Sequence, residues 1–214
     1  PVYPVEAGLV VNKSFSDWGS GYQYSIEVEN TGATVDTWTI TVKKSDVSIP
    51  PPVFDQGYLD YVYNDCTFVP ESTYDAILAT GELPDWFLPV LNGEIEMTDD
   101  EKVTAVMYYV YKLAPYSMDT EYSPEGEDFV AWFISSARSG YCVHYATTAA
   151  ILLRMLGVPT RYVSGYSLPY PIETELISDM YLVTDNDAHA WCEFFSPDYG
   201  WVGFDPTNNR FVDG

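Results

Sequence analysis

The sequence predicts an α+β fold, in which helices come first along the chain and strands follow. Apolar residues recur at helical spacing between residues 98 and 156, and segments rich in β-branched and aromatic residues follow from residue 160 onward. The chain has 214 residues, of which 47% are hydrophobic. It is therefore long enough for one ordinary domain with a small appendage, and it can fill a core.

Residues 1–48 are predicted to form a β-rich N-terminal segment. Alternating side chains and turn-rich separators indicate strands at 8–13, 22–29 and 37–42. Three short strands make a poor core, so they must pack on the rest of the chain or belong to a larger β-sandwich. Trp18 to Tyr22 and the region around Trp38 resemble part of a bacterial cellulose-binding module. The segment is thus interpreted either as a cell-wall or glycan contact or as a structural appendage.

Residues 49–97 are predicted to be a proline-rich connector followed by a mixed region. Successive prolines in Ile49–Val53 remove backbone donors and exclude a helix, which favours a domain boundary there. The catalytic domain is expected over residues 98–214.

Three helices are expected at the start of this domain. Thr98 and Glu101 have capping-box spacing, which predicts a helix from there to Leu113 with Val103, Val106, Met107 and Val110 inward. Ser123-Pro124 is taken to open a second helix. A third should run from Cys142 to Leu156 and end at Gly157. Strands are expected at 160–166, 180–184, 188–195 and 201–204.

The charge excludes two classes of partner. Lysine and arginine number 9 against 32 acidic residues, giving a formal charge of −23. Nucleic acid and anionic lipid surfaces both require basic patches, so neither is an expected partner. No apolar stretch approaches the ~20 residues that span a membrane, which predicts no membrane insertion. The chain starts at Pro1 without a signal peptide, and we expect an extracellular or cell-surface protein whose signal lies outside this sequence.

Cys142 is the predicted nucleophile. It stands in the first turn of an expected helix, where free backbone amides and the positive end of the helix dipole favour a thiolate. The small and apolar residues that follow it indicate a central helix that holds this end rigidly.

His189 and Asp205 are the predicted partners of this thiol. Strand alternation puts His189, Trp191 and Glu193 on one face and Ala190, Cys192 and Phe194 on the other. A turn at 196–200 would make the next strand an antiparallel neighbour, which lets Asp205 reach the imidazole. Asp187 is the alternative acid, but the extended chain keeps it ~6 to 7 Å from His189. Asp205 is therefore preferred in a cysteine–histidine–aspartate triad.

Four motifs in order resemble the transglutaminase-like superfamily over residues 98–208. They are Gly140-Tyr-Cys-Val-His-Tyr-Ala146, Leu153 to Tyr166, His189-Ala-Trp191 and Gly200-Trp-Val-Gly-Phe-Asp-Pro-Thr207. The resemblance implies a papain-like α+β core, in which the nucleophile helix packs on an antiparallel sheet, and a thioester intermediate. Carried over position by position, it makes Cys142 the nucleophile, His189 the general base and Asp205 the orienting acid.

A transglutaminase-like cysteine enzyme that acts on peptide or protein amides is the function we expect. Its thioester is resolved by water or by an amine; hydrolysis is preferred, because no acceptor-amine site is evident. The backbone amide of Cys142 is a natural oxyanion donor. Tyr116, Trp132 and Tyr141 are unranked candidates for the second donor. A non-catalytic surface module and an inactive family member are the alternatives.

Other polar residues are given structural roles. His144 points to a different side of the helix from Cys142 and is interpreted as a packed, hydrogen-bonded histidine, not a second base or ligand. Zinc-type spacing and the calcium-loop pattern are both missing, so no metal or cofactor is expected. Arg154 and Arg161 should anchor the turn from helix to strand through ion pairs. Cys66 and Cys192 are hypothesised to form a disulfide, leaving Cys142 free.

Overall fold

The computed structural model describes residues 9–17, 22–30, 52–167, 185–208 and 210–211. The chain divides into two compact units. One is formed by residues 1–59 with 197–199, and the other by residues 60–196 with 200–214.

The first unit contains an antiparallel hairpin. Strand β1 (Leu9–Asp17) pairs with β2 (Tyr22–Asn30) along the whole length of both strands. Two of the three N-terminal strand predictions are thereby confirmed. The third, at 37–42, lies outside the described residues, as do Trp18 and Trp38, on which the glycan interpretation rests.

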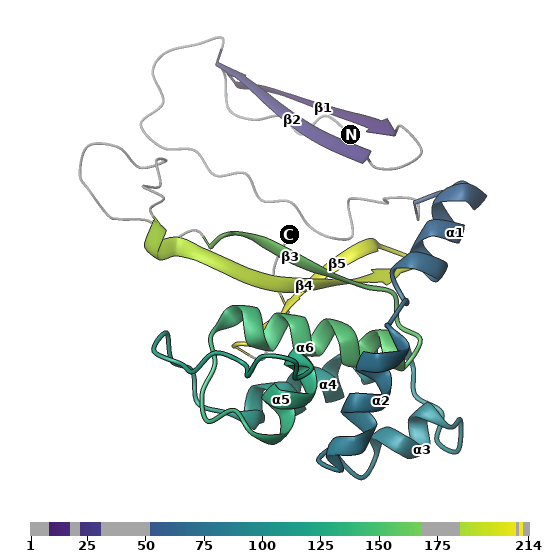
Figure 1. Ribbon diagram of the computed structural model, residues 1–214. Helices are drawn as coiled ribbons and strands as arrows, with labels where there is room; N and C mark the ends of the chain where they lie inside the picture. The colour runs from purple at the N-terminus through teal and green to yellow at the C-terminus, as the bar shows by residue number, and fades with distance from the viewer. Residues whose placement is uncertain (1–8, 18–21, 31–51, 168–184, 209, 212–214) are drawn as a thin grey trace. The chain divides into compact units, whose positions relative to one another are not determined.

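The second unit is built on one antiparallel sheet. Its strands are adjacent in chain order: β3 (Thr160–Tyr166), β4 (Ala188–Ser196), β5 (Gly200–Asp205) and β6 (Arg210–Phe211). The predicted strands at 160–166, 188–195 and 201–204 are confirmed to within one residue, while the one at 180–184 lies outside the described residues. Helices cover one face of this sheet, and the α+β prediction is confirmed (Figure 1).

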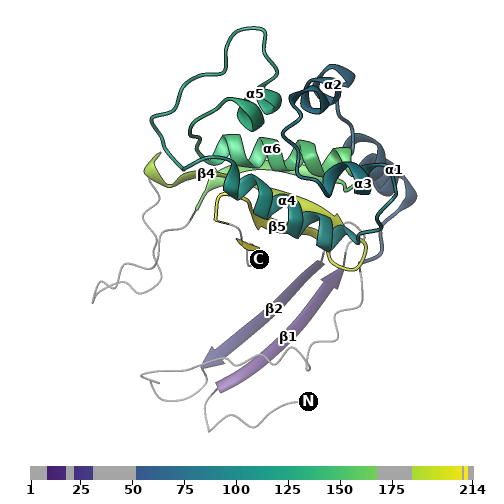
Figure 2. The same ribbon diagram turned by 90° about the horizontal axis from the view of Figure 1, so that it is seen from below.

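Six α-helices precede the sheet in the described part of the chain. They are α1 (Gln56–Asp65), α2 (Glu71–Thr80), α3 (Phe87–Leu91), α4 (Asp99–Leu113), α5 (Phe129–Ser135) and α6 (Cys142–Met155). The first three occupy the region that shows no clear pattern in the sequence. Helix α6 contacts β3 and β4, with α4 and α5 packed along its sides (Figure 2).

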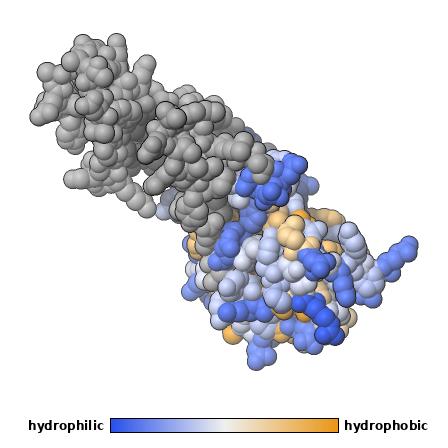
Figure 3. All heavy atoms as spheres, turned by 90° about the vertical axis from the view of Figure 1, so that its left-hand side faces the viewer, coloured by the Kyte–Doolittle hydropathy of each residue, from blue (hydrophilic) through white to orange (hydrophobic). Residues whose placement is uncertain are grey.

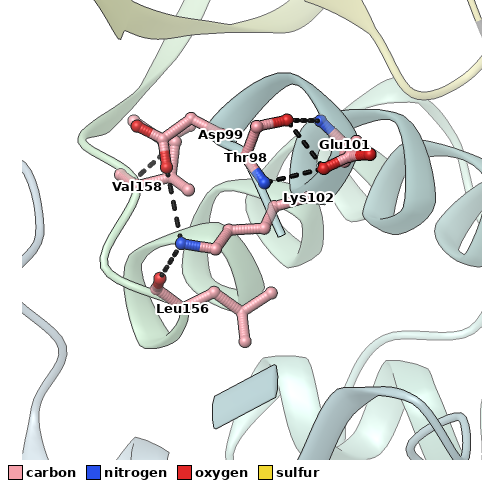
Figure 4. A network of polar contacts seen from close by, with 7 residues as sticks. Thr98, Asp99, Glu101, Lys102, Leu156 and Val158 are labelled. Atoms are coloured by element: carbon pink, nitrogen blue, oxygen red, sulfur yellow. Dashed lines mark hydrogen bonds and ion pairs between the residues drawn. The ribbon is translucent and has the colours of Figure 1, made fainter. Parts of the chain in front are cut away.

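Helix α4 begins as its sequence predicts. The Thr98 hydroxyl accepts from the Glu101 amide at 3.3 Å, and the Glu101 carboxylate accepts from the Thr98 amide at 2.8 Å (Figure 4). Lys102 then donates to the backbone oxygen of Leu156 at 3.2 Å, so the cap region of α4 is tied to the residue that follows α6. All four apolar residues predicted to face inward are buried: Val103, Val106, Met107 and Val110.

Helix α5 starts later than expected. The Asp128 carboxylate accepts from the amides of Val130 and Ala131, both at 3.0 Å, so it satisfies the donors of a first turn that begins at Phe129. Gly126 has φ +85°, which breaks helical continuity between Pro124 and this cap. The prediction of a start at Ser123-Pro124 is therefore wrong, because a side-chain cap downstream decides where the helix begins.

The core lies between α6 and the sheet. Four side chains of α6 are fully buried: Ala146, Ala149, Leu152 and Leu153. Cys192 and Phe204 face them from β4 and β5. Burial of apolar surface stabilises the folded state by ~25 cal/mol per Å², so this packing holds the helix that carries Cys142 firmly in place. Within the described residues, no helix is long and apolar enough to cross a membrane.

The two arginines fix the edges of this layer differently. Arg161 pairs with Glu193 across β3 and β4, and its guanidinium lies 4.0 Å from the ring centroid of Trp201. Arg154 instead donates to the backbone oxygens of Thr160 at 2.9 Å and Phe68 at 3.3 Å. An ion pair is thus confirmed for Arg161, whereas the contacts found for Arg154 are with carbonyls.

Candidate active site

Cys142 is the first residue of α6, with 7% of its surface exposed. The chain reaches it through Gly140, where an added Cβ would lie 2.6 Å from the Phe133 ring. Glycine is therefore needed there for the backbone to pass close to α5. Because most of α6 is buried, the thiol is held at a rigid helix N-terminus, as the sequence predicts.

His189 and Asp205 meet at the ends of two neighbouring strands. The pairing of β4 with β5 runs from Ser196 opposite Gly200 to Cys192 opposite Phe204. This register brings the Asp205 Oδ2 atom to 2.9 Å from His189 Nε2. The carboxyl group is almost fully buried, at 2% exposure, so solvent hardly screens the pair.

The thiol of Cys142 lies within hydrogen-bonding reach of the His189 side chain and of the Ala190 amide. Burial alone would raise the pKa of Cys142, but these two donors and the charge of His189 outweigh it and lower the pKa below its ordinary value. The structure thus brings together Cys142, His189 and Asp205.

The imidazole is held in its charged form by its two neighbours. Hydrogen bonds to Asp205 and Cys142 raise the pKa of His189 to about 9, against the opposing effect of burial. For Asp205, burial favours the neutral acid, yet the hydrogen bond and charge of His189 and the bond from the Thr207 amide lower the pKa. These electrostatic effects together favour a thiolate beside an imidazolium beside a carboxylate, the arrangement that activates a cysteine nucleophile.

Asp205 is anchored by the turn that follows it. Its Oδ1 atom accepts from the Thr207 amide at 2.9 Å, and its Oδ2 atom accepts from Asn208 Nδ2 at 2.7 Å. The sequence pattern indicates Asp205 but not these anchoring groups. The Asp-Pro-Thr-Asn order is itself a turn signal, and it is the one clue in the sequence to their role.

Tyr116 is the second-donor candidate that lies at the site. The segment before it runs beside Gly140, which donates to the Pro115 oxygen at 3.2 Å. Its hydroxyl lies within hydrogen-bonding reach of the amide and thiol of Cys142, and burial followed by the charge of Cys142 raises its pKa. Tyr116 and His189 line one hollow of about 230 Å³, together with Thr207 and Asn208.

The other two aromatic candidates pack elsewhere. The Trp132 ring is 6.0 Å from that of His144, and the Tyr141 ring meets His144 edge-on at 4.6 Å. His144 is buried, and its Nδ1 atom accepts from the Tyr141 amide at 3.3 Å. Burial lowers the pKa of His144, which favours a neutral ring. The prediction of a packed, hydrogen-bonded histidine is confirmed.

The remaining cysteines correct one hypothesis. Cys66 and Cys192 are free thiols, so the proposed disulfide between them is wrong. The Sγ atom of Cys192 instead donates to the Ala146 oxygen at 3.0 Å, in the core on the opposite face of β4 from His189. The odd number of cysteines suggested this pairing, but each of the two thiols is buried as a free thiol instead. Across the described parts of the chain, no group of three or more potential ligands is arranged to hold a metal ion.

The sequence and the fold of this chain are similar to those of known proteins. A profile of the transglutaminase-like superfamily matches residues 90–206, more than half of the chain. The chain belongs to the transglutaminase-like superfamily. The resemblance drawn from the four motifs is confirmed, and this superfamily includes cysteine enzymes.

Two bacterial relatives are similar over this region. YebA of Bacillus subtilis is 37% identical over 136 residues, which cover 59% of this chain and 18% of YebA. A protein-glutamine gamma-glutamyltransferase of Pseudomonas aeruginosa is 35% identical over 107 residues, which cover 50% of this chain and 16% of the relative. The chain thus spans less than a fifth of the length of either protein.

A solved structure matches a larger share of the chain. The periplasmic domain of TgpA from Pseudomonas aeruginosa, bound to ethylmercury, aligns with a TM-score of 0.50 and 25% sequence identity. The alignment covers 70% of this chain and 49% of that domain.

Proposed function

We propose that this domain transfers the acyl group of a glutamine side chain in a peptide or protein through a thioester on Cys142. The observation that carries the proposal is the line of three groups from the N-terminus of α6 to the end of β5, joined at His189 by the 2.9 Å bond to Asp205. The name of the Pseudomonas relative supports glutamine as the acyl donor.

The first half-reaction follows from the electrostatics of the site. The Cys142 thiolate attacks the carboxamide carbon, so that an S–C bond forms and the carbonyl electron pair moves to oxygen. The backbone amide of Cys142 and the Tyr116 hydroxyl would donate to that oxyanion. As the tetrahedral intermediate collapses, the C–N bond breaks and the imidazolium of His189 gives its proton to the leaving ammonia.

The second half-reaction resolves the thioester. Neutral His189 takes a proton from the incoming nucleophile, which attacks the thioester carbon and releases the thiolate. Water gives glutamate and an amine gives a substituted amide. We propose that the thioester passes to an amine when one is abundant and to water otherwise, since both nucleophiles compete for one intermediate.

The test uses a peptide with a single glutamine, with and without a primary alkylamine. The expected products are the deamidated peptide without amine and the amine adduct with it, both identified by mass spectrometry. Cys142→Ser should abolish both, and Cys66→Ser is the matched control, because it alters a buried thiol that contacts none of the three groups. Equal turnover by Cys142→Ser and the parent protein would contradict the proposal.

We also propose that the domain works outside the cytoplasm, on the likeness to a periplasmic domain. The excess of acidic residues suits such a setting. Figure 3 shows the side on which β4 begins, and the part of it that is coloured is mainly hydrophilic with small hydrophobic patches. Fractionation of cells that produce the full-length protein, followed by protease treatment of intact cells, checks this placement. Protection of the domain from protease both in intact cells and after the outer layers are opened would contradict it.

A further inference from the structure

Asn208 lies one residue beyond the family motif that ends at Thr207, and it contacts the triad directly. The backbone closes a turn here, because the Asn208 amide donates to the Asp205 oxygen at 3.3 Å. The Asn208 side chain makes a separate contact, from its Nδ2 atom to the Oδ2 atom of Asp205 at 2.7 Å. The turn is thus closed by a main-chain hydrogen bond, and the Asn208 carboxamide is not needed to close it.

The oxygen that Asn208 binds is the same oxygen that binds His189. Oδ2 accepts from His189 Nε2 at 2.9 Å and from Asn208 Nδ2 at 2.7 Å, while Oδ1 accepts from the Thr207 amide at 2.9 Å. Three donors fix the plane of the carboxylate, whose rotation would otherwise swing Oδ2 away from the imidazole. Bonds to a charged acceptor are among the stronger ones in proteins.

Asn208 is also exposed, in contrast to the buried carboxylate that it binds. It lines the hollow of about 230 Å³ with Tyr116, His189 and Thr207. The side chain that binds Asp205 and the imidazole that Asp205 supports therefore line the same hollow.

We propose that Asn208 is a positioning residue, whose carboxamide holds Asp205 so that His189 is aimed at Cys142. The proposal rests on the proposed function for its effect on turnover, although its effect on His189 is measurable without any substrate. Loss of the Asn208 donor should lower kcat about tenfold, since one hydrogen bond to a charged group is lost, and should leave KM nearly unchanged.

The groups that face His189 define what a titration of its ring reports. Asp205 faces it from the end of β5, and Cys142 faces it from the start of α6. The Tyr116 hydroxyl faces Cys142 from the segment between α4 and α5. Asp187 precedes His189 by two residues, and Glu193, on the same face of β4, is paired with Arg161. A substitution at Asn208 changes none of these groups, so a shift in the titration midpoint of His189 reports an effect transmitted through Asp205.

The decisive variant is Asn208→Leu, which keeps the approximate shape of the side chain and removes the donor without adding a charge. The chain has two histidines, so the Cε1–H resonances of His189 and His144 are readily distinguished by NMR. We expect the His189 titration midpoint to fall by about one unit, because Asp205 is no longer held in place to stabilise the imidazolium. The midpoint of His144, which is packed among aromatic rings, should not move.

Two further variants make the test complete. Asn92→Leu makes the same change at an exposed residue that follows α3, and it should leave both the His189 midpoint and kcat unchanged. Asn208→Ala keeps the main-chain turn and removes only the carboxamide, so it reports the tenfold loss of kcat if the leucine variant folds poorly.

The outcomes separate the two proposals. An unchanged His189 midpoint in Asn208→Leu together with an unchanged kcat in Asn208→Ala would overturn the positioning role. A shifted midpoint in a protein that processes no glutamine peptide would support the role of Asn208 and count against the proposed activity.

Discussion

Cys142 and Cys192 are both buried, but they differ in what surrounds the thiol. At the N-terminus of α6, the neighbours of Cys142 are donors: an imidazole and backbone amides lower its pKa in spite of burial. On β4, Cys192 is fully buried in the core, and burial, followed by the charge of Asp205, raises the pKa of its thiol. Burial by itself therefore produces an inert cysteine, and burial with aimed donors produces a nucleophile.

The largest expected effect comes from replacing each of these two cysteines by alanine in turn. Cys142→Ala should reduce turnover of a glutamine peptide by a factor on the order of 10³ or more, because the attacking atom is gone. Cys192→Ala should leave turnover nearly intact and lower the free energy of unfolding by about 1 kcal/mol, since it only opens the core. Peptide turnover and urea unfolding of both variants measure the contrast, and an inactive but stable Cys192→Ala would break it.

The acid that supports His189 gives the next effect. Asp205→Asn keeps the size of the side chain and removes the charge that stabilises the imidazolium, so turnover should fall about 10³-fold. The titration midpoint of His189 should move down from about 9 toward its ordinary value. Steady-state kinetics and histidine NMR check the two parts. A midpoint that stays near 9 would mean that Asp205 does not set the charge of the ring.

Thiol reactivity sharpens the comparison without any substrate. At pH 6.5, iodoacetamide should modify Cys142 more than tenfold faster than Cys66 or Cys192, because the thiolate is the reactive form and the imidazole and backbone amides around Cys142 stabilise it. In His189→Ala the pH midpoint of Cys142 alkylation should rise, since burial then acts without the opposing imidazolium. Peptide mapping of modified sites across a pH series measures this. Equal rates at all three cysteines would contradict it.

The smallest expected effect is on stability. The pKa of His189 is raised from 6.5 to about 9 in the folded chain, so the charged ring stabilises the fold. This contribution is fully present below pH ~6.5 and is lost as the pH rises through about 9; we expect it to be on the order of 2 kcal/mol. Urea unfolding of the parent protein and His189→Gln at pH 6 and pH 9.5 measures it. A stability gap between the two proteins that widens at high pH would contradict the sign.

Some features were predictable because they are local. The capping box at Thr98 and Glu101, the alternation along β4 and the place of Cys142 at a helix start all depend on neighbours within a few residues. The start of α5 was not predictable from Pro124, because the Asp128 cap and Gly126 compete with it. Helices α1 to α3 escaped prediction because each of them buries only one or two residues, too few to show a helical period in the sequence.

The sequence by itself determined the family, the order of helices and strands, and which three side chains have the chemistry of a triad. Tertiary structure alone decided the protonation that this chemistry requires. Residues 142, 189 and 205 are far apart along the chain, and only the packing of α6 on the sheet and the register of β4 with β5 bring His189 Nε2 within 2.9 Å of Asp205. The fate of the other thiols was decided in the same way, because a pKa depends on distance, burial and donors in space, and sequence spacing specifies none of these.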